Sequence, residues 1–167
     1  MIMIVGARGN IQDVDSFLKQ VLGFAQKHDV VIQVFNAEMI YGKNHLESAT
    51  EHAVRARDQS TNTTNSLGME ILLYASGERQ LKLAIPKMGV KKGKGNIAFV
   101  FTNGKISDKL VNEILKHLTL ERDDKVLDGD RNTLKKFGLK ETEIETVKKA
   151  KYGNLILEKV AVVDIIK

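Results

Sequence analysis

Apolar residues are most concentrated between Leu67 and Ala75, where only Gly68 and Glu70 interrupt the run. A helix that is apolar on every side is usually buried, because a surface helix keeps one polar face. This segment therefore predicts a central buried helix with one carboxylate in its middle. A lone carboxylate in such a setting is costly, so we expect Arg79 or a buried amide to stabilise Glu70.

The rest of the chain mixes helical and extended patterns. Apolar residues at helical spacing predict helices over 13–28, 42–58, 78–88, 107–118, 132–137 and 141–149, with one or two helical turns over 152–158. Runs rich in β-branched residues predict strands over 1–5, 30–35, 97–102 and 160–166. Because strands and helices do not alternate regularly, a doubly wound parallel sheet is disfavoured. We expect an α+β fold with a small, largely antiparallel or mixed sheet of three to four strands, surrounded by helices.

Polar residues with special backbone roles flank the predicted central helix. Asn65 and Ser66 lie where the helix begins, and their side-chain oxygens can accept hydrogen bonds from its free amides. At the other end, Gly77 tolerates the turn that stops a helix. Ser76 is then expected to cap a second helix over residues 78–88. Two helix N-termini would present free N–H groups, which attract phosphates and other anions.

The second helix and the turn after it supply cations for the same purpose. Arg79 and Gln80 would lie in its first turn, and Lys87, Lys91 and Lys92 follow with no acidic residue among them. Single-stranded RNA suits this arrangement, because its phosphates bind amides and cations. Ordinary helix capping and a solvated basic turn are the alternative interpretations. The chain has no Trp and few aromatic residues to stack on bases, so we expect modest affinity that is strengthened within a larger complex.

Composition narrows the class of protein. The length fits one domain over residues 1–167. The absence of Cys excludes disulfides and cysteine metal sites. No apolar run approaches the roughly 18 residues that span a bilayer, and the first residues do not form a signal peptide, so we expect a cytoplasmic protein. The net charge is +5, but residues 121–130 hold five acidic and two basic residues, which leaves +8 on the remainder. Such a charge favours a polyanionic partner.

The sequence offers little for catalysis or metal binding. His45 and His52 are seven residues apart, about 10 Å along a helix, and the four-residue spacing of a zinc protease is absent. The glycine-rich segment 89–96 lacks the spacing of a phosphate loop, and residues 128–139 lack the ligands of a calcium loop. We therefore expect no metal, no cofactor and no enzyme activity. An enzyme that uses His45 and Glu70 is the third-ranked alternative.

A set of motifs extends over nearly the whole chain. The central ones are Asn65-Ser66, Glu70-Ile71-Leu72, Ser76-Gly77-Glu78-Arg79-Gln80 and Ala84-Ile85. The flanking ones are Gln33-Val34-Phe35-Asn36-Ala37, His45-Leu46, Ala49, Ala53, Ala56 and Leu157-Glu158-Lys159-Val160-Ala161. Together they resemble the small accessory subunit of the KEOPS complex, the partner of its small kinase-like ATPase. Pro86 departs from the pattern and should bend or shorten the second helix.

The resemblance implies a non-catalytic subunit at one end of a linear complex, in which it is a monomer. The subunit would bind the kinase-like ATPase and help recruit tRNA through its single-stranded CCA 3′ end. The complex would then place a threonylcarbamoyl group on an adenosine beside the anticodon. Carried over to matching positions, the implied RNA contacts are Asn65, Ser66, Ser76, Gly77, Arg79 and Gln80.

The residues themselves add Lys87, Lys91 and Lys92 as phosphate contacts. For the kinase-like partner we expect Tyr152, Leu155 and Ile156 to form an exposed apolar patch, with core packing as the alternative. The alternative function is a purely protein-binding regulator of the kinase-like subunit without direct RNA contact.

Overall fold

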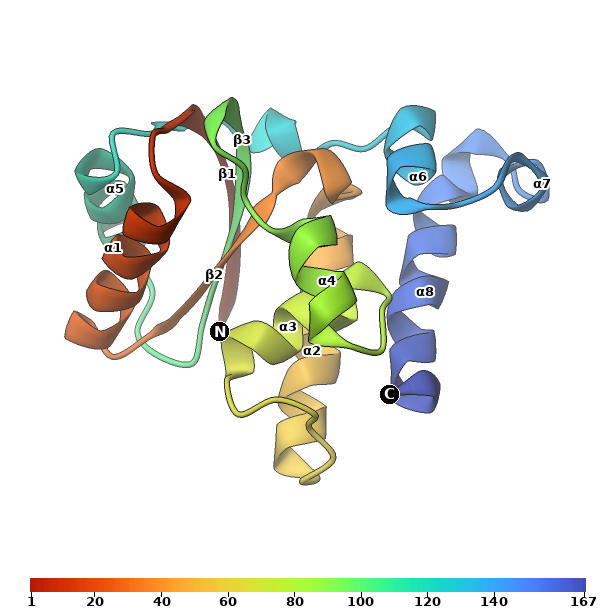
Figure 1. Ribbon diagram of the computed structural model, residues 1–167, viewed down its shortest axis with the longest axis horizontal. Coiled ribbons are helices and arrows are strands. Elements are labelled where there is room, and N and C mark those ends of the chain that lie inside the picture. The colour runs from red at the N-terminus through yellow and green to blue at the C-terminus, as the bar shows by residue number, and fades with distance from the viewer.

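The computed structural model describes residues 1–167 and contains one four-stranded antiparallel sheet (Figure 1). The strand order is β2-β3-β1-β4. β1 (Ile2–Ile11) and β3 (Gly93–Thr102) pair along their whole lengths. β2 (Val31–Asn36) covers only part of β3, and β4 (Glu121–Arg122) pairs with two residues of β1. The predicted α+β class with a small antiparallel sheet is confirmed.

Helices cover both faces of the sheet, so the domain has two hydrophobic cores. α1 (Val14–Lys27) and α5 (Asp108–His117) pack on one face, on the left in Figure 1. α2 (Gly42–Asp58), α3 (Leu67–Ser76) and α8 (Tyr152–Ile166) pack on the other face. Because side chains alternate along a strand, each long strand contributes to both cores. No helix is both long and apolar enough to cross a membrane.

Shorter helical segments connect these main elements. They are η1 (Ala37–Met39), α4 (Leu81–Met88), η2 (Asp124–Leu127), α6 (Arg131–Phe137), α7 (Glu141–Ile144) and η3 (Lys149–Lys151), where η denotes a 3₁₀ helix. α7 ends well before the predicted boundary at residue 149. The predicted helices over 13–28, 42–58 and 107–118 are confirmed.

Two predictions for the chain ends are wrong. β1 does not stop at Val5 but continues through Gly6 to Ile11. Glycine is required inside the strand there, because a Cβ on Gly6 would lie 2.5 Å from the carbonyl oxygen of Asp123. Residues 160–166 form the second half of α8 rather than a strand. Burial on the large core overrides their β-branched composition.

α3 is the buried central helix that the sequence predicts. Every residue from Leu67 to Ser76 is buried except Met69, which is partly exposed. α2 packs against it through Ala49, Ala53 and Ala56, whose small side chains allow close approach. α8 lies on its other side, as Figure 1 shows.

Glu70, in the middle of α3, is fully buried and has partners from distant segments. The backbone N–H of Thr63 donates to both carboxylate oxygens, at 2.9 and 3.1 Å, and that of Thr64 donates to Oε1 at 3.1 Å. The Lys167 ammonium lies 3.6 Å from Oε2 and 4.6 Å from the centre of the Tyr74 ring. The predicted pairing with Arg79 is therefore wrong, and the alternative of buried amides is confirmed.

Removal of this carboxylate should strongly destabilise the fold. In Glu70→Ala the amides of Thr63 and Thr64 and the buried Lys167 ammonium would lose their partner, so we expect a loss of roughly 3–5 kcal/mol. Chemical denaturation measures the loss, and amide hydrogen exchange should accelerate at both threonines. Glu113→Ala removes an exposed carboxylate on α5 and should change the free energy of unfolding by less than about 0.5 kcal/mol. Equal stabilities of the two variants would contradict the role given to Glu70.

Candidate nucleic-acid interface

The predicted RNA-contacting residues gather mainly around the corner between α3 and α4. Ser76 is fully buried there, and its hydroxyl donates to the carbonyl of Leu73 at 2.6 Å and accepts from the N–H of Glu78 at 3.0 Å. Gly77 ends α3 with a φ of +70°, a conformation that favours glycine. Ser76 therefore shapes the turn and does not cap the next helix. α4 begins three residues later than predicted, at Leu81, with Gln80 as its uncapped N-cap residue.

Lys87 stabilises this corner from inside. Its ammonium donates to the carbonyl of Ser76 at 2.7 Å and to Glu78 at 3.3 Å, and it lies 3.8 Å above the Phe137 ring. Burial lowers the pKa of Lys87, although the carboxylate of Glu78 acts in the opposite direction. Pro86 lies within α4 without ending it, so the helix is shortened at its start and not at the proline. Lys87 is thus directed to the protein interior in this arrangement.

The remaining basic and amide side chains of the corner are exposed. Arg79 and Gln80 lie in the loop before α4, and Lys91 and Lys92 lie in the turn after it. The ammonium of Lys91 donates to the carbonyl of Pro86 at 2.8 Å. The eight residues of α4 separate the two groups by about 12 Å.

Asn65 and Ser66 lie at the opposite end of α3 from this corner. Both are exposed, and the Ser66 hydroxyl accepts from the N–H of Met69 at 3.3 Å, which confirms the predicted cap of α3. The ten residues of α3 are about 15 Å long. The two predicted helix N-termini consequently do not converge on one anion site.

The residues predicted to contact a protein partner lie in the first two turns of α8. Leu155 and Ile156 are buried in the large core, so the expected exposed patch is wrong for them and the core alternative holds. Tyr152 is half-buried, and its hydroxyl accepts from Arg131 at 3.1 Å. The exposed apolar residues of α8 lie further along, at Val162, Ile165 and Ile166. The three-residue spacing of Val160 and Val163 is typical of one face of a helix. This spacing was the sequence signal that could have placed Val162, Ile165 and Ile166 on the exposed face.

His45 and His52, the two histidines of α2, both form hydrogen bonds within the protein. Buried His45 accepts from the N–H of Tyr41 at Nδ1 and bonds the carbonyl of Ala75 through Nε2, at 3.1 and 2.8 Å. Its burial lowers its pKa to about 4. His52 stacks on Tyr74 and bonds Asp164 at 2.8 Å, and Asp164 also accepts from the Tyr74 hydroxyl. The structure contains no group of three acidic or histidine side chains arranged to hold a metal.

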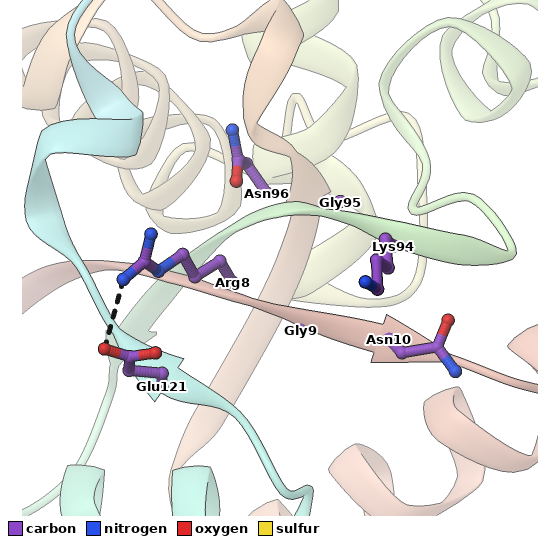
Figure 2. Close-up of a pocket in the computed structure, with 7 residues that line it drawn as sticks. All are labelled: Arg8, Gly9, Asn10, Lys94, Gly95, Asn96 and Glu121. Atoms are coloured by element: carbon purple, nitrogen blue, oxygen red, sulfur yellow. Dashed lines mark hydrogen bonds and ion pairs between the residues drawn. The ribbon is translucent and has the colours of Figure 1, made fainter.

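A polar hollow of about 590 Å³ lies where β1 and β3 extend beyond the other strands (Figure 2). Its lining residues are Arg8, Gly9, Asn10, Lys94, Gly95, Asn96 and Glu121, none of them apolar. The sequence analysis missed this site because it ended the first strand at residue 5 and began the third at residue 97, whereas β1 extends to Ile11 and β3 begins at Gly93. The guanidinium of Arg8 donates to Glu121 at 3.1 Å and lies 3.7 Å from Asp123. The hydrogen bond and the two negative charges raise the pKa of Arg8.

Comparison with known proteins identifies similar sequences. The model of a family described as "Kinase binding protein CGI-121" matches residues 9–164. The chain is also similar to the "Regulatory protein Cgi121" of Methanocaldococcus jannaschii, with 29% identity over 139 residues. That alignment covers 81% of this chain and 84% of the relative. The first description refers to kinase binding and the second to regulation.

The buried His45 should make stability depend on pH. Its pKa is about 4 in the folded protein, against 6.5 ordinarily, so the unfolded chain takes up a proton first as the pH falls. The free energy of unfolding should therefore decrease by roughly 3 kcal/mol between pH 7 and pH 4 through this group alone. Denaturation at a series of pH values should show a smaller decrease in His45→Gln. The control His117→Gln, at an exposed position of α5, should keep the wild-type slope, and identical slopes in all three proteins would exclude this effect.

Proposed function

The chain belongs to the CGI-121 family of kinase-binding proteins, and we propose that it is a non-catalytic subunit of the KEOPS complex. In this proposal it binds the small kinase-like ATPase and helps recruit tRNA through the single-stranded CCA 3′ end for threonylcarbamoyladenosine modification. The observation that carries the proposal is the family match, which extends over nearly the whole fold. The subunit would act in the cytoplasm as a monomer within the hetero-oligomeric complex, without a cofactor of its own.

The outer face of α8 is our candidate for the kinase contact. Val162, Ile165 and Ile166 are 42, 82 and 40% exposed, although all three are large apolar residues. Exposed apolar groups on one element mark interaction surfaces when they lie together. In this proposal Tyr152 borders the contact at the start of the helix. Leu155 and Ile156 hold α8 in position from the core side.

The corner between α3 and α4 is our candidate for the CCA contact. Arg79 and Gln80 are exposed there and offer a guanidinium for phosphate and an amide for base edges or ribose. Ser76, Gly77 and Lys87 support the corner that presents them, through the contacts already described. Asn65 and Ser66 would contact RNA at the far end of α3. Lys91 and Lys92 would bind phosphates beyond α4.

The tRNA contact predicts a specific response to loss of the 3′ end. Purified protein should bind a tRNA with an intact CCA end more tightly than the same tRNA with that end removed. Arg79→Ala should weaken binding to the intact tRNA by roughly tenfold, because a charge-assisted contact of about 1.5 kcal/mol is lost. Lys109→Ala, an exposed change on α5, is the control and should leave binding unchanged. No binding of either tRNA would favour the alternative, a purely protein-binding regulator of the kinase-like subunit.

The kinase contact predicts that a charge on the outer face of α8 blocks assembly. Ile165→Asp should reduce capture of the organism's own kinase-like ATPase by at least tenfold, because burying an unpaired carboxylate in an interface is costly. Size-exclusion chromatography and calorimetric titration measure the complex. Leu22→Asp makes the same change at a 59% exposed leucine of α1 and should not affect assembly. Equal affinities of the two variants would place the kinase contact elsewhere.

A further inference from the structure

A segment that is rich in basic residues and contains no acidic residue extends from the α3–α4 corner into the sheet. Residues 79–107 contain no Asp or Glu. Their basic residues are Arg79, Lys82, Lys87, Lys91, Lys92, Lys94 and Lys105. A segment with several positive charges and no negative charge attracts polyanions. Most of these basic residues lie on α4, in the turn after it and at the start of β3.

The start of β3 belongs to a two-stranded extension of the sheet. Beyond Arg8 on β1 and before Ile97 on β3, neither β4 nor β2 continues the pairing. Here Arg8 lies opposite Asn96, and Asn10 lies opposite Lys94, with Gly9 opposite Gly95 between them. We call Arg8, Asn10, Lys94 and Asn96 the β1–β3 platform.

The four platform side chains share one face of the sheet. Residues two apart on a strand, and residues directly opposite each other, project to the same side. On the other face, a Cβ on Gly9 would meet Leu120 at 2.5 Å, whereas Gly95 opposite it has open space. The four polar side chains therefore gather on the face that forms the polar hollow drawn in Figure 2.

We propose that the β1–β3 platform binds the sugar–phosphate backbone of tRNA outside its CCA end. This inference rests on the proposed tRNA-recruiting function and adds a second contact on the same RNA. The platform offers two cations and two side-chain amides, and these are the groups that bind phosphate and ribose oxygens. It has no apolar lining residue on which a base could stack, so the contact is independent of nucleotide sequence.

The position of the platform fits a second contact. Exposed Lys91 and Lys92 lie directly before Lys94, and α4, about 12 Å long, separates them from Arg79 and Gln80. One RNA can therefore reach both groups, and two linked contacts bind much more tightly than either alone. In this proposal the second contact compensates for the small number of aromatic residues on which bases could stack.

Acidic residues define where the RNA lies on the platform. Glu121 and Asp123 pair with Arg8 at the β4 edge, so they partly neutralise its charge and repel phosphates from that edge. Lys94 has no acidic partner, so phosphates lie toward Lys94. The pair between Arg8 and Glu121 is exposed, at 53 and 71% of the two side chains, and pairs of this kind are weak.

The test compares charge reversal on the platform with the same change beyond the other end of β3. In full-length protein, Lys94→Glu should weaken binding of intact tRNA and CCA-trimmed tRNA by the same factor, roughly fivefold near 0.1 M salt. The slope of log affinity against log salt should become shallower by about one. Lys105→Glu is the matched control, at an exposed residue after the end of β3. Glu121→Gln should tighten binding of both tRNAs.

The same titrations separate failure of this inference from failure of the proposed CCA contact. Equal tRNA affinities of the platform and control variants would overturn the platform, whatever the effect of trimming. Platform-dependent binding that is unaffected by trimming would support the platform and reject the CCA contact. Reduced capture of the kinase-like ATPase by the platform variant, with tRNA affinity unchanged, would assign this surface to protein and overturn the inference. Unchanged denaturation midpoints show that each variant is folded.

Discussion

The buried carboxylate of Glu70 is the constraint on which the arrangement of the large core depends. It accepts hydrogen bonds from the amides of Thr63 and Thr64 and lies 3.6 Å from the Lys167 ammonium, so the loop before α3 and the C-terminal end of α8 meet at one side chain. Apolar packing is not directional and could not by itself fix how the loop before α3 and the end of α8 lie against the helix. Hydrogen bonds to a buried charge have defined geometry, and a partner left alone there is costly.

The fixed position of α3 also determines where polar groups reach the surface. Gly77 turns the chain at the end of the buried helix α3. The position of α3 therefore determines where the exposed Arg79 and Gln80 lie on the surface. The ammonium of Lys87 closes the corner by bonding the carbonyl of Ser76. A cation that the sequence analysis assigns to RNA phosphates thus holds the turn in place, and Arg79 and Gln80 beside it are exposed.

The sequence predicts the elements whose signals are local. The helices over 42–58 and 107–118 have clear apolar periodicity, and the second begins at a serine whose hydroxyl does accept from the N–H of Leu110. One prediction failed because a distant segment decides: packing against the large core makes residues 160–166 helical. The prediction for Ser76 failed for a local reason, because its hydroxyl bonds the carbonyl of Leu73 and the N–H of Glu78. Arg79 and Gln80 are exposed, whereas the β1–β3 platform forms only when residues 8–10 pair in register with residues 94–96.

The two proposed binding surfaces lie apart, and their contacts should respond to different conditions. In Figure 1 the end of α8 (marked C) lies in the lower part of the view and β3 starts near its top. Exposed apolar residues lie at the first and basic residues precede the second. Apolar contacts depend little on ionic strength, whereas phosphate contacts weaken steeply as salt rises. A protein partner on α8 could therefore stay bound while tRNA exchanges at the basic surface. In the proposed function this separation has a use, because each modified tRNA must leave before the next one binds.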